Sequence, residues 1–231
     1  MKKIILIVFS IGLVHLVYAQ FYFGPIGGYH ANLIINQNNY GDSELGYDLD
    51  MGIEVGLMLG YQINTATGIQ LNFIYSQMGQ NYKDELFDGT AIKEVKLNYV
   101  QIPILLELLP FEYKQSAFST KPSIYVLIGP QMSFLGTTEY LYTKRNGQDV
   151  GLPPGANSSH QLFNELDFEV VLEPGIQMYL NRAIFIKAGG RGVLGITDIN
   201  EERFQIPNPE GKYGASRNAT FGANIGIGIL L

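Results

Sequence analysis

The sequence predicts an all-β protein, a single up-and-down antiparallel transmembrane β-barrel of eight strands with long extracellular loops. First, alternation of apolar and polar residues recurs along the chain, and no stretch after the N-terminus holds the 18 or so consecutive apolar residues of a spanning helix. Second, charged residues make up only 16% of the chain, below the roughly 25% of an ordinary soluble domain. Third, 15 Tyr, 13 Phe and 27 Gly suit barrel strands better than helices.

The N-terminus has the pattern of an export signal. Two lysines directly after the initiating Met precede an apolar run over 4–17, and Ala19 then precedes Gln20. A permanent membrane helix is the alternative, but the run is shorter than the roughly 20 residues that spanning requires. We therefore expect a cleaved signal peptide over 1–19 and one outer-membrane β-barrel domain over 20–231.

The first three expected strands differ in the quality of their alternation. Residues 22–34 alternate poorly, and this strand is expected because it follows the cleavage site and brings the count to an even, closable number. Residues 51–63 place apolar side chains on one face and Gly, Glu and Gln mainly on the other. Residues 68–79 repeat this pattern after the short connection 64–67, which predicts a tight hairpin.

The next two strands are expected over 94–109 and 123–135. In the first, the apolar face changes phase after Gln101, and Pro103 stands next to the change. A one-residue change of phase predicts a β-bulge, where the missing donor of proline is tolerated. The second strand alternates around an apolar face that includes Pro130.

The last three strands are expected over 163–180, 183–196 and 219–231. The connection Asn181-Arg182 is short enough to make the first two neighbours in a hairpin. The final strand alternates large apolar residues with Gly and Asn. The connections then run roughly long, short, long, medium, long, short, long. Short periplasmic turns and longer external loops are typical of outer-membrane barrels, and the medium connection, 110–122, is expected to be a long periplasmic turn.

Alternation alone does not say which face points inward. A soluble lipocalin-like barrel holds its apolar face inside, and a membrane barrel turns that face to lipid. The polar faces are poor in Lys, rich in Gly and carry charges of both signs, which favours a narrow, plugged lumen because buried charges persist when they are paired. The candidate site is therefore a lumen charge network of Glu54, Glu169, Glu173, Lys187 and Arg191.

Four stretches carry a family resemblance. Residues 98–106 hold an aromatic, an amide, an apolar residue, Pro and a run of Leu, and residues 121–130, 167–179 and 194–199 continue the likeness. They resemble the PorT-like outer-membrane β-barrel family of the Bacteroidetes. The resemblance implies a barrel of the cell envelope, and the founding member is tied to type IX protein secretion. The chain departs from a common outer-membrane pattern because it ends in Leu231 rather than an aromatic residue.

Residues with possible site chemistry are sparse. His160 follows two serines in the longest loop and could suggest a hydrolase, although loop residues of this kind are usually solvated. His30 is expected to be a packed polar residue of the lumen. Asp42, Glu44, Asp48 and Asp50 lack EF-hand spacing for calcium, and Lys144-Arg145 could contact lipopolysaccharide phosphates. The chain contains no cysteine, and no cofactor is predicted.

The function expected from these observations is that of a non-enzymatic outer-membrane barrel of the Gram-negative envelope, structural or partner-binding. Its expected partners are outer-membrane lipid, lipopolysaccharide and envelope or secretion-system proteins. The formal charge of −6, from 15 basic and 21 acidic residues, speaks against nucleic acid. The alternatives are a barrel enzyme that modifies outer-membrane lipid and a small-ligand-binding barrel.

Overall fold

The structure, a computed structural model, describes residues 20–35, 46–84, 91–109, 121–144, 146–205, 207 and 211–231. The expected signal peptide over 1–19 lies outside these residues, so its cleavage stays a prediction. Within the residues described, no helix has the length and apolar character needed to cross a membrane.

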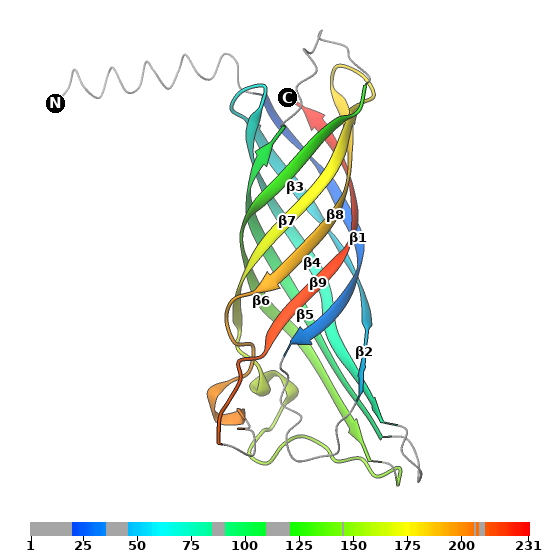
Figure 1. Cartoon of the computed structure of the whole chain (residues 1–231), viewed down its shortest axis with the longest axis vertical. Coiled ribbons are helices and arrows are strands. Elements are labelled where there is room, and N and C mark those ends of the chain that lie inside the picture. The colour runs from blue at the N-terminus through cyan, green and yellow to red at the C-terminus, as the bar shows by residue number, and fades with distance from the viewer. Residues whose placement is uncertain are drawn as a thin grey trace, which may run out of the picture.

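Long antiparallel strands form one closed ring, as the sequence predicts (Figure 1). Eight of them pair in the cyclic order β1-β3-β4-β5-β6-β7-β8-β9, and β1 closes the ring by pairing with β9. The short β2 pairs with β4 beyond the end of β3. The strands are β1 (Gln20–Ile35), β2 (Gly46–Asp48), β3 (Asp50–Gln62), β4 (Thr67–Asp84), β5 (Ala91–Leu108), β6 (Ser123–Thr143), β7 (Leu166–Tyr179), β8 (Ile184–Gly195) and β9 (Arg217–Leu230).

Two asparagines shape the two short turns. In the turn from β3 to β4, Asn64 Oδ1 accepts the backbone N–H groups of Ala66 (2.8 Å) and Thr67 (2.9 Å). Asn181 Oδ1 does the same in the turn from β7 to β8, with Ala183 (2.8 Å) and Ile184 (2.9 Å). An asparagine side chain that mimics a backbone turn fixes where each hairpin reverses. We call this end of the barrel the turn end, and the opposite end the loop end.

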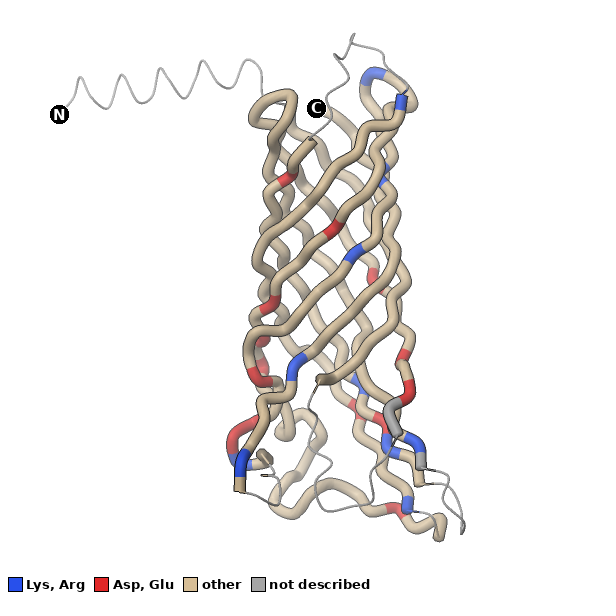
Figure 2. The backbone as a smooth tube through the Cα atoms, viewed as in Figure 1, with Lys and Arg blue, Asp and Glu red and all other residues tan. Residues whose placement is uncertain are grey.

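The apolar faces of the strands point outward. Leu57, Phe73, Val170 and Ile227 each expose between 42% and 58% of their surface, although they lie in the middle of paired strands. Lys, Arg, Asp and Glu are sparse along the barrel wall and gather toward the loop end (Figure 2). The structure is therefore not the soluble barrel with an apolar interior, because most of its apolar surface lies on the outer wall. We call this outer surface the apolar belt.

The bulge that we expected in β5 is absent there, so that prediction was wrong. Burial alternates without a break from Ala91 to Leu108. The register shift in this hairpin lies on the partner strand, because Asn98 pairs with Thr137 and Tyr99 with Leu135, which leaves Gly136 unpaired. The apparent change of phase in β5 has another cause. Near the loop end its apolar residues face inward, whereas further along the strand the apolar residues face outward.

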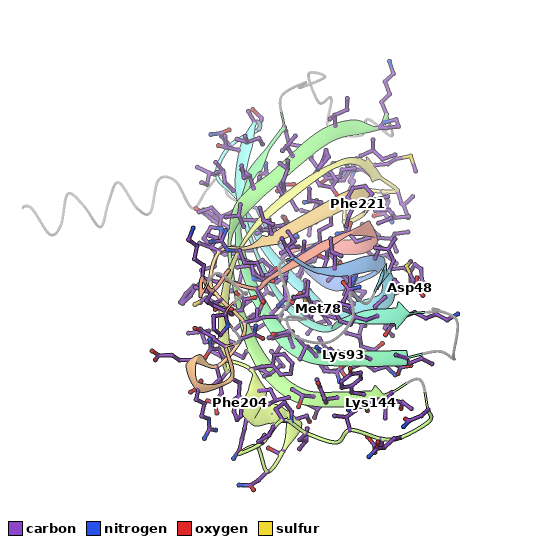
Figure 3. The ribbon with its side chains drawn as sticks, turned by 60° about the horizontal axis from the view of Figure 1, so that its bottom comes forward. Asp48, Met78, Lys93, Lys144, Phe204 and Phe221 are labelled. Carbon is purple, nitrogen blue, oxygen red and sulfur yellow. The ribbon has the colours of Figure 1, made fainter. Side chains whose placement is uncertain are left out.

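The reversed polarity near the loop end belongs to a second, smaller core. Beyond the apolar belt, the outer faces of β4, β5 and β6 become polar, with Gln77, Lys96, Asn98, Thr137 and Glu139. Met78 and Lys93 lie on the inner side of these strands, whereas Phe221 lies on the outer wall (Figure 3). The loop-end core consists of Ile34, Met78, Tyr82, Ala91, Val95, Leu97, Tyr99, Leu135, Tyr142, Leu162, Phe163 and Ile199.

This reversal explains why β4 and β6 run further than we expected. We ended them at residues 79 and 135, where the outward apolar pattern stops, but they continue to Asp84 and Thr143. An outer face that becomes polar while the inner face becomes apolar is the arrangement of a strand in water. The strands therefore leave the apolar medium before they end.

The two long connections near the loop end are joined to each other. Phe163, before β7, forms a β-bridge with Asn200, after β8. Asn164 donates its backbone N–H to the Ile199 carbonyl at 2.8 Å and its side-chain amide to the Asp198 carbonyl at 2.9 Å. Leu162, Phe163 and Ile199 from these segments belong to the loop-end core. The two connections therefore form one packed surface at the loop end of the barrel.

Candidate functional site

The inner wall of the barrel offers space for large side chains because many of its residues are glycine. A Cβ atom at Gly60 would lie 1.8 Å from Cζ of Tyr22, and one at Gly228 would lie 2.0 Å from Cζ of Phe185. Tyr125 fills the space beside Gly175 in the same way. An eight-stranded barrel is just wide enough for its own side chains, and glycines opposite rings allow these rings to cross the lumen.

Lys187 lies at the centre of the polar cluster nearer the turn end. Its Nζ forms a close ion pair with Glu107 and donates to Gln70 Oε1 at 3.0 Å and to the Tyr22 hydroxyl oxygen at 3.1 Å. The same Nζ lies 4.9 Å from the ring centroid of Tyr22 and 5.0 Å from that of Tyr125. Tyr22 in turn donates to Gln70 Oε1 at 2.9 Å. The ammonium group is thus fully surrounded by acceptors and ring faces.

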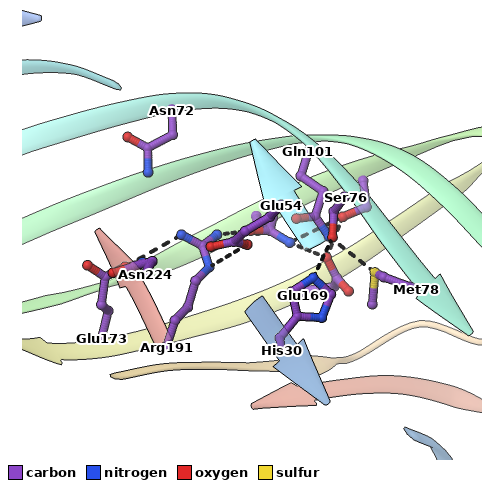
Figure 4. Close-up of polar contacts among 12 residues, drawn as sticks. His30, Glu54, Asn72, Ser76, Met78, Gln101, Glu169, Glu173, Arg191 and Asn224 are labelled. Carbon is purple, nitrogen blue, oxygen red and sulfur yellow. Dashed lines mark hydrogen bonds and ion pairs between the residues drawn. The ribbon is translucent and has the colours of Figure 1, made fainter. Parts of the chain in front are cut away.

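Arg191 lies at the centre of the second polar cluster, nearer the loop end (Figure 4). Its Nη1 lies 3.5 Å from Glu173 Oε2, its Nε lies 3.7 Å from Glu54 Oε2, and its Nη2 donates to Gln131 Oε1 at 2.6 Å. Glu173 also accepts from Tyr125 Oη and from Asn224 Nδ2, each at 2.8 Å. One guanidinium group therefore joins side chains from β3, β6 and β7 across the lumen.

The third carboxylate of the expected network, Glu169, has a different surrounding. Its Oε2 accepts from Gln131 Nε2 at 2.5 Å and from the Ser133 hydroxyl, which are both neutral donors. Its Oε1 has no hydrogen-bond partner, and neither do Nε and Nη1 of Arg191, whose carboxylate contacts are the long ion pairs given above. The five expected residues all face the lumen and are each 7% exposed or less.

A cavity of about 10 Å³ lies beside this second cluster, lined by His30, Glu54, Arg191 and residues of β9. That volume holds about one water molecule, and its lining is polar. Of the side chains that lack full hydrogen-bond partners, Arg191 borders this cavity. This cavity is therefore of a size for a solvent molecule.

His30 connects two further polar side chains of the lumen. Its Nδ1 lies 2.6 Å from Asn32 Oδ1, and its Nε2 lies 3.2 Å from Ser76 Oγ. An amide oxygen can only accept, so Nδ1 carries a proton, and in the neutral ring Nε2 accepts from the serine hydroxyl. This order of groups is that of a hydrolase relay. All three residues are at most 6% exposed, so the hydroxyl is enclosed by the barrel.

The other candidates from the sequence are not brought together. Ser159 Oγ donates to the Thr138 carbonyl at 2.9 Å, in a 3-10 turn that also contains His160. Asp50 accepts from Asn81 Nδ2 at 3.2 Å, whereas Asp42, Glu44 and Arg145 lie outside the described residues. In the parts of the chain that the structure covers, no group of three or more His, Asp or Glu is placed to hold a metal ion.

Solved structures share this architecture at low sequence identity. The outer membrane protein OprG from Pseudomonas aeruginosa is 14% identical, with 93% of this chain and 97% of that chain covered and a TM-score of 0.52. Neisserial surface protein A is 14% identical over 90% and 97%, with a TM-score of 0.43. Ail of Yersinia pestis, in complex with the heparin analogue sucrose octasulfate, is 13% identical over 92% and 99%, with a TM-score of 0.39. No curated protein matches the chain.

A family model supplies the assignment that these distant structures do not. The model described as outer membrane protein beta-barrel domain matches residues 18–201, which is most of the chain. The matched range contains β1 to β8, with Lys187, Arg191 and the glutamates that pair with them. With its closed ring of eight strands and its outward apolar belt, the chain belongs to the outer membrane protein β-barrel domain family and is a protein of the outer membrane.

Proposed function

We propose that this protein is a non-enzymatic barrel with a closed lumen, which serves envelope structure and presents its loop end to partners. The observation that carries the proposal is the filling of the lumen by two charged clusters, around Lys187 and Arg191, with apolar side chains packed beside them. This group consists of Leu105, Tyr125, Leu127, Val171 and Val193. An ion that crossed the barrel would have to displace both clusters.

Conductance in planar bilayers tests the closed lumen. We expect the wild-type barrel to show little steady conductance, because each charged cluster spans the interior. A variant with both lumen cations removed, Lys187→Ser with Arg191→Ser, should conduct more if it folds. A variant of the outer wall, Lys96→Ser, is the matched control and should behave as the wild type. Large and stable channels in the wild-type protein would contradict the proposal and revive a porin function.

The loop end is the part of the protein that we expect to bind partners. The two joined connections and the loop-end core provide a packed surface there, and the sequence resemblance to the PorT-like family supports a partner in protein secretion. Lipopolysaccharide is a second expected partner, because long loops face the outer leaflet in barrels of this kind. Crosslinking in intact envelopes followed by co-purification tests both. Recovery of the barrel with lipid alone would remove the secretion hypothesis.

One observation favours an enzyme, namely the chain Ser76, His30 and Asn32. The enclosure of all three groups and the small size of the neighbouring cavity speak against a lipid substrate. We therefore expect no covalent labelling of the folded barrel by a fluorophosphonate. Labelling that depends on Ser76 would favour the lipid-modifying enzyme instead, and Ser133→Ala is a suitable control because Ser133 is equally buried in the lumen.

A further inference from the structure

A pronounced depression lies on the outer wall of the barrel near the turn end. Its volume is about 370 Å³, and it crosses β1, β3 and β4. The side chains that line it are apolar or aromatic, and none carries a charge. Its lining consists of Phe21, Tyr22, Phe23, Leu59, Gly60, Tyr61, Ile69, Leu71 and Leu231.

The strand register explains the shape of this depression. Tyr61 pairs with Phe21 on one side and with Ile69 on the other, and this row forms its turn-end wall. The rings of Phe21 and Tyr61 are 4.8 Å apart and inclined by 47°, so they do not lie flat against each other. Phe23, Leu59 and Leu71 form the next row. Two rows over three strands leave a short trough between them.

Leu231 closes one end of the trough. The backbone N–H of Leu231 donates to the Phe21 carbonyl at 2.9 Å, which anchors Leu231 beside β1. The Leu231 side chain nevertheless stays 81% exposed. An anchored residue with an open apolar side chain can contact a molecule that lies in the trough.

We propose that this trough binds one acyl chain of a phospholipid from the leaflet on the turn side. The trough is continuous with the apolar belt, so hydrocarbon chains already surround it. The side chains of its lining carry no charge, so they recognise the acyl chain by packing and do not select a headgroup. Short turns face the periplasm in barrels of this kind, so the lipid comes from the inner leaflet, on the side of the periplasm.

Selective binding has to come from packing. In a membrane the competitor of a lipid chain is another lipid chain, so the hydrophobic effect does not distinguish the trough from the rest of the belt. A concave wall contacts a chain on more sides than a convex wall does, and each additional close atom pair adds dispersion energy. The first lipid should therefore bind about tenfold more tightly than later ones, which corresponds to about 1.4 kcal/mol.

Native mass spectrometry of the delipidated barrel, titrated with dioleoylphosphatidylethanolamine in detergent, tests this proposal. Leu71→Trp fills the trough, and Leu172→Trp places the same bulk on the opposite wall, where Leu172 is 50% exposed. The chain contains no tryptophan, so the emission of each introduced residue and the gel mobility of the barrel report whether both variants fold.

The wild type and Leu172→Trp should each retain one tightly bound lipid, and Leu71→Trp should lose this first site. Several equivalent weak sites in all three proteins would overturn the proposal. A dimer that Leu71→Trp abolishes, without any bound lipid, would also overturn it, because the trough would then be an interface between two copies of the chain.

Discussion

The ion pair between Lys187 and Glu107 offers a strict test of how the lumen stabilises the barrel. Both side chains are almost fully buried, at 4% and 1% exposure. The substitution Lys187→Met keeps the length of the side chain but leaves the carboxylate with the Tyr22 hydroxyl, at 3.2 Å, as a remaining donor. Removing one partner of a buried ion pair costs about 3–5 kcal/mol of folding free energy.

The double variant Lys187→Met with Glu107→Gln should recover most of this loss. The neutral amide no longer needs a cation and can still accept from Tyr22 and bond with Gln70. Replacement of a whole buried pair by neutral groups is often close to neutral, so we expect a coupling energy of about 2 kcal/mol or more. Urea unfolding in lipid vesicles, followed by the gel mobility of the folded barrel, measures all four proteins of this cycle.

A surface ion pair provides the matched control. Lys96 Nζ lies 3.9 Å from Glu139 Oε2, and these side chains are 49% and 73% exposed. Lys96→Met should change the unfolding free energy by about 0–1 kcal/mol, because water screens such pairs. If Lys187→Met costs no more than Lys96→Met, or if the cycle shows no coupling, the buried pair does not stabilise the barrel in the way argued above.

Three further predictions concern the belt, the loop-end core and the N-terminus. Phe73→Arg should destabilise the barrel in bilayers by about 2–4 kcal/mol. Gln77→Arg, four residues along the same face of β4, should be nearly neutral because Gln77 lies beyond the apolar belt. Refolding into vesicles measures both variants, and equal losses of stability would refute this boundary of the belt. Leu97→Ala should lower the free energy of local unfolding of the loop-end core by about 2–5 kcal/mol. The long connections should then be cleaved faster by proteases, while the barrel keeps its gel mobility. N-terminal sequencing of envelope material should begin at Gln20, and retention of residues 1–19 would contradict cleavage.

Local signals in the sequence were sufficient for the barrel and for part of its register. Counting back from Asn181-Arg182 places Gln177 opposite Lys187, and the structure pairs these residues. The same count brings Glu173 to Arg191, whose side chains lie 3.5 Å apart. A short turn determines the register of its own hairpin. The pairing between β7 and β8 can therefore be predicted from the sequence alone.

Contacts across the lumen did not follow from the sequence in the same way. Glu107 was missed as the partner of Lys187, although alternation with Leu106 and Leu108 would have placed it on the inner face. Gln131 also reaches Arg191 from β6, which does not pair with the strand of Arg191. Which side chains meet across a barrel depends on strand tilt and stagger, and neither quantity is set by alternation.

The loop-end core shows the opposite limitation. Val95, Leu97 and Tyr99 share one apolar face in the sequence, and the change of phase after Gln101 predicted a bulge, whereas the structure buries all three residues on the inner side. A strand that passes from lipid into water inverts its pattern, since the medium outside it changes. The inverted phase therefore looks like a bulge in the sequence although the backbone of β5 is regular there.

The cluster around Lys187 also has a consequence for the order of events in folding. Its members Tyr22, Gln70, Glu107 and Lys187 come from β1, β4, β5 and β8, and the first and last of them are 165 positions apart. An open sheet of these strands would hold Lys187 far from Tyr22, because they meet only when β1 pairs with β9. Contacts between such distant segments form late and slowly. The lysine therefore becomes desolvated at the moment of ring closure, and variants of this cluster should alter the unfolding rate far more than the early steps of assembly.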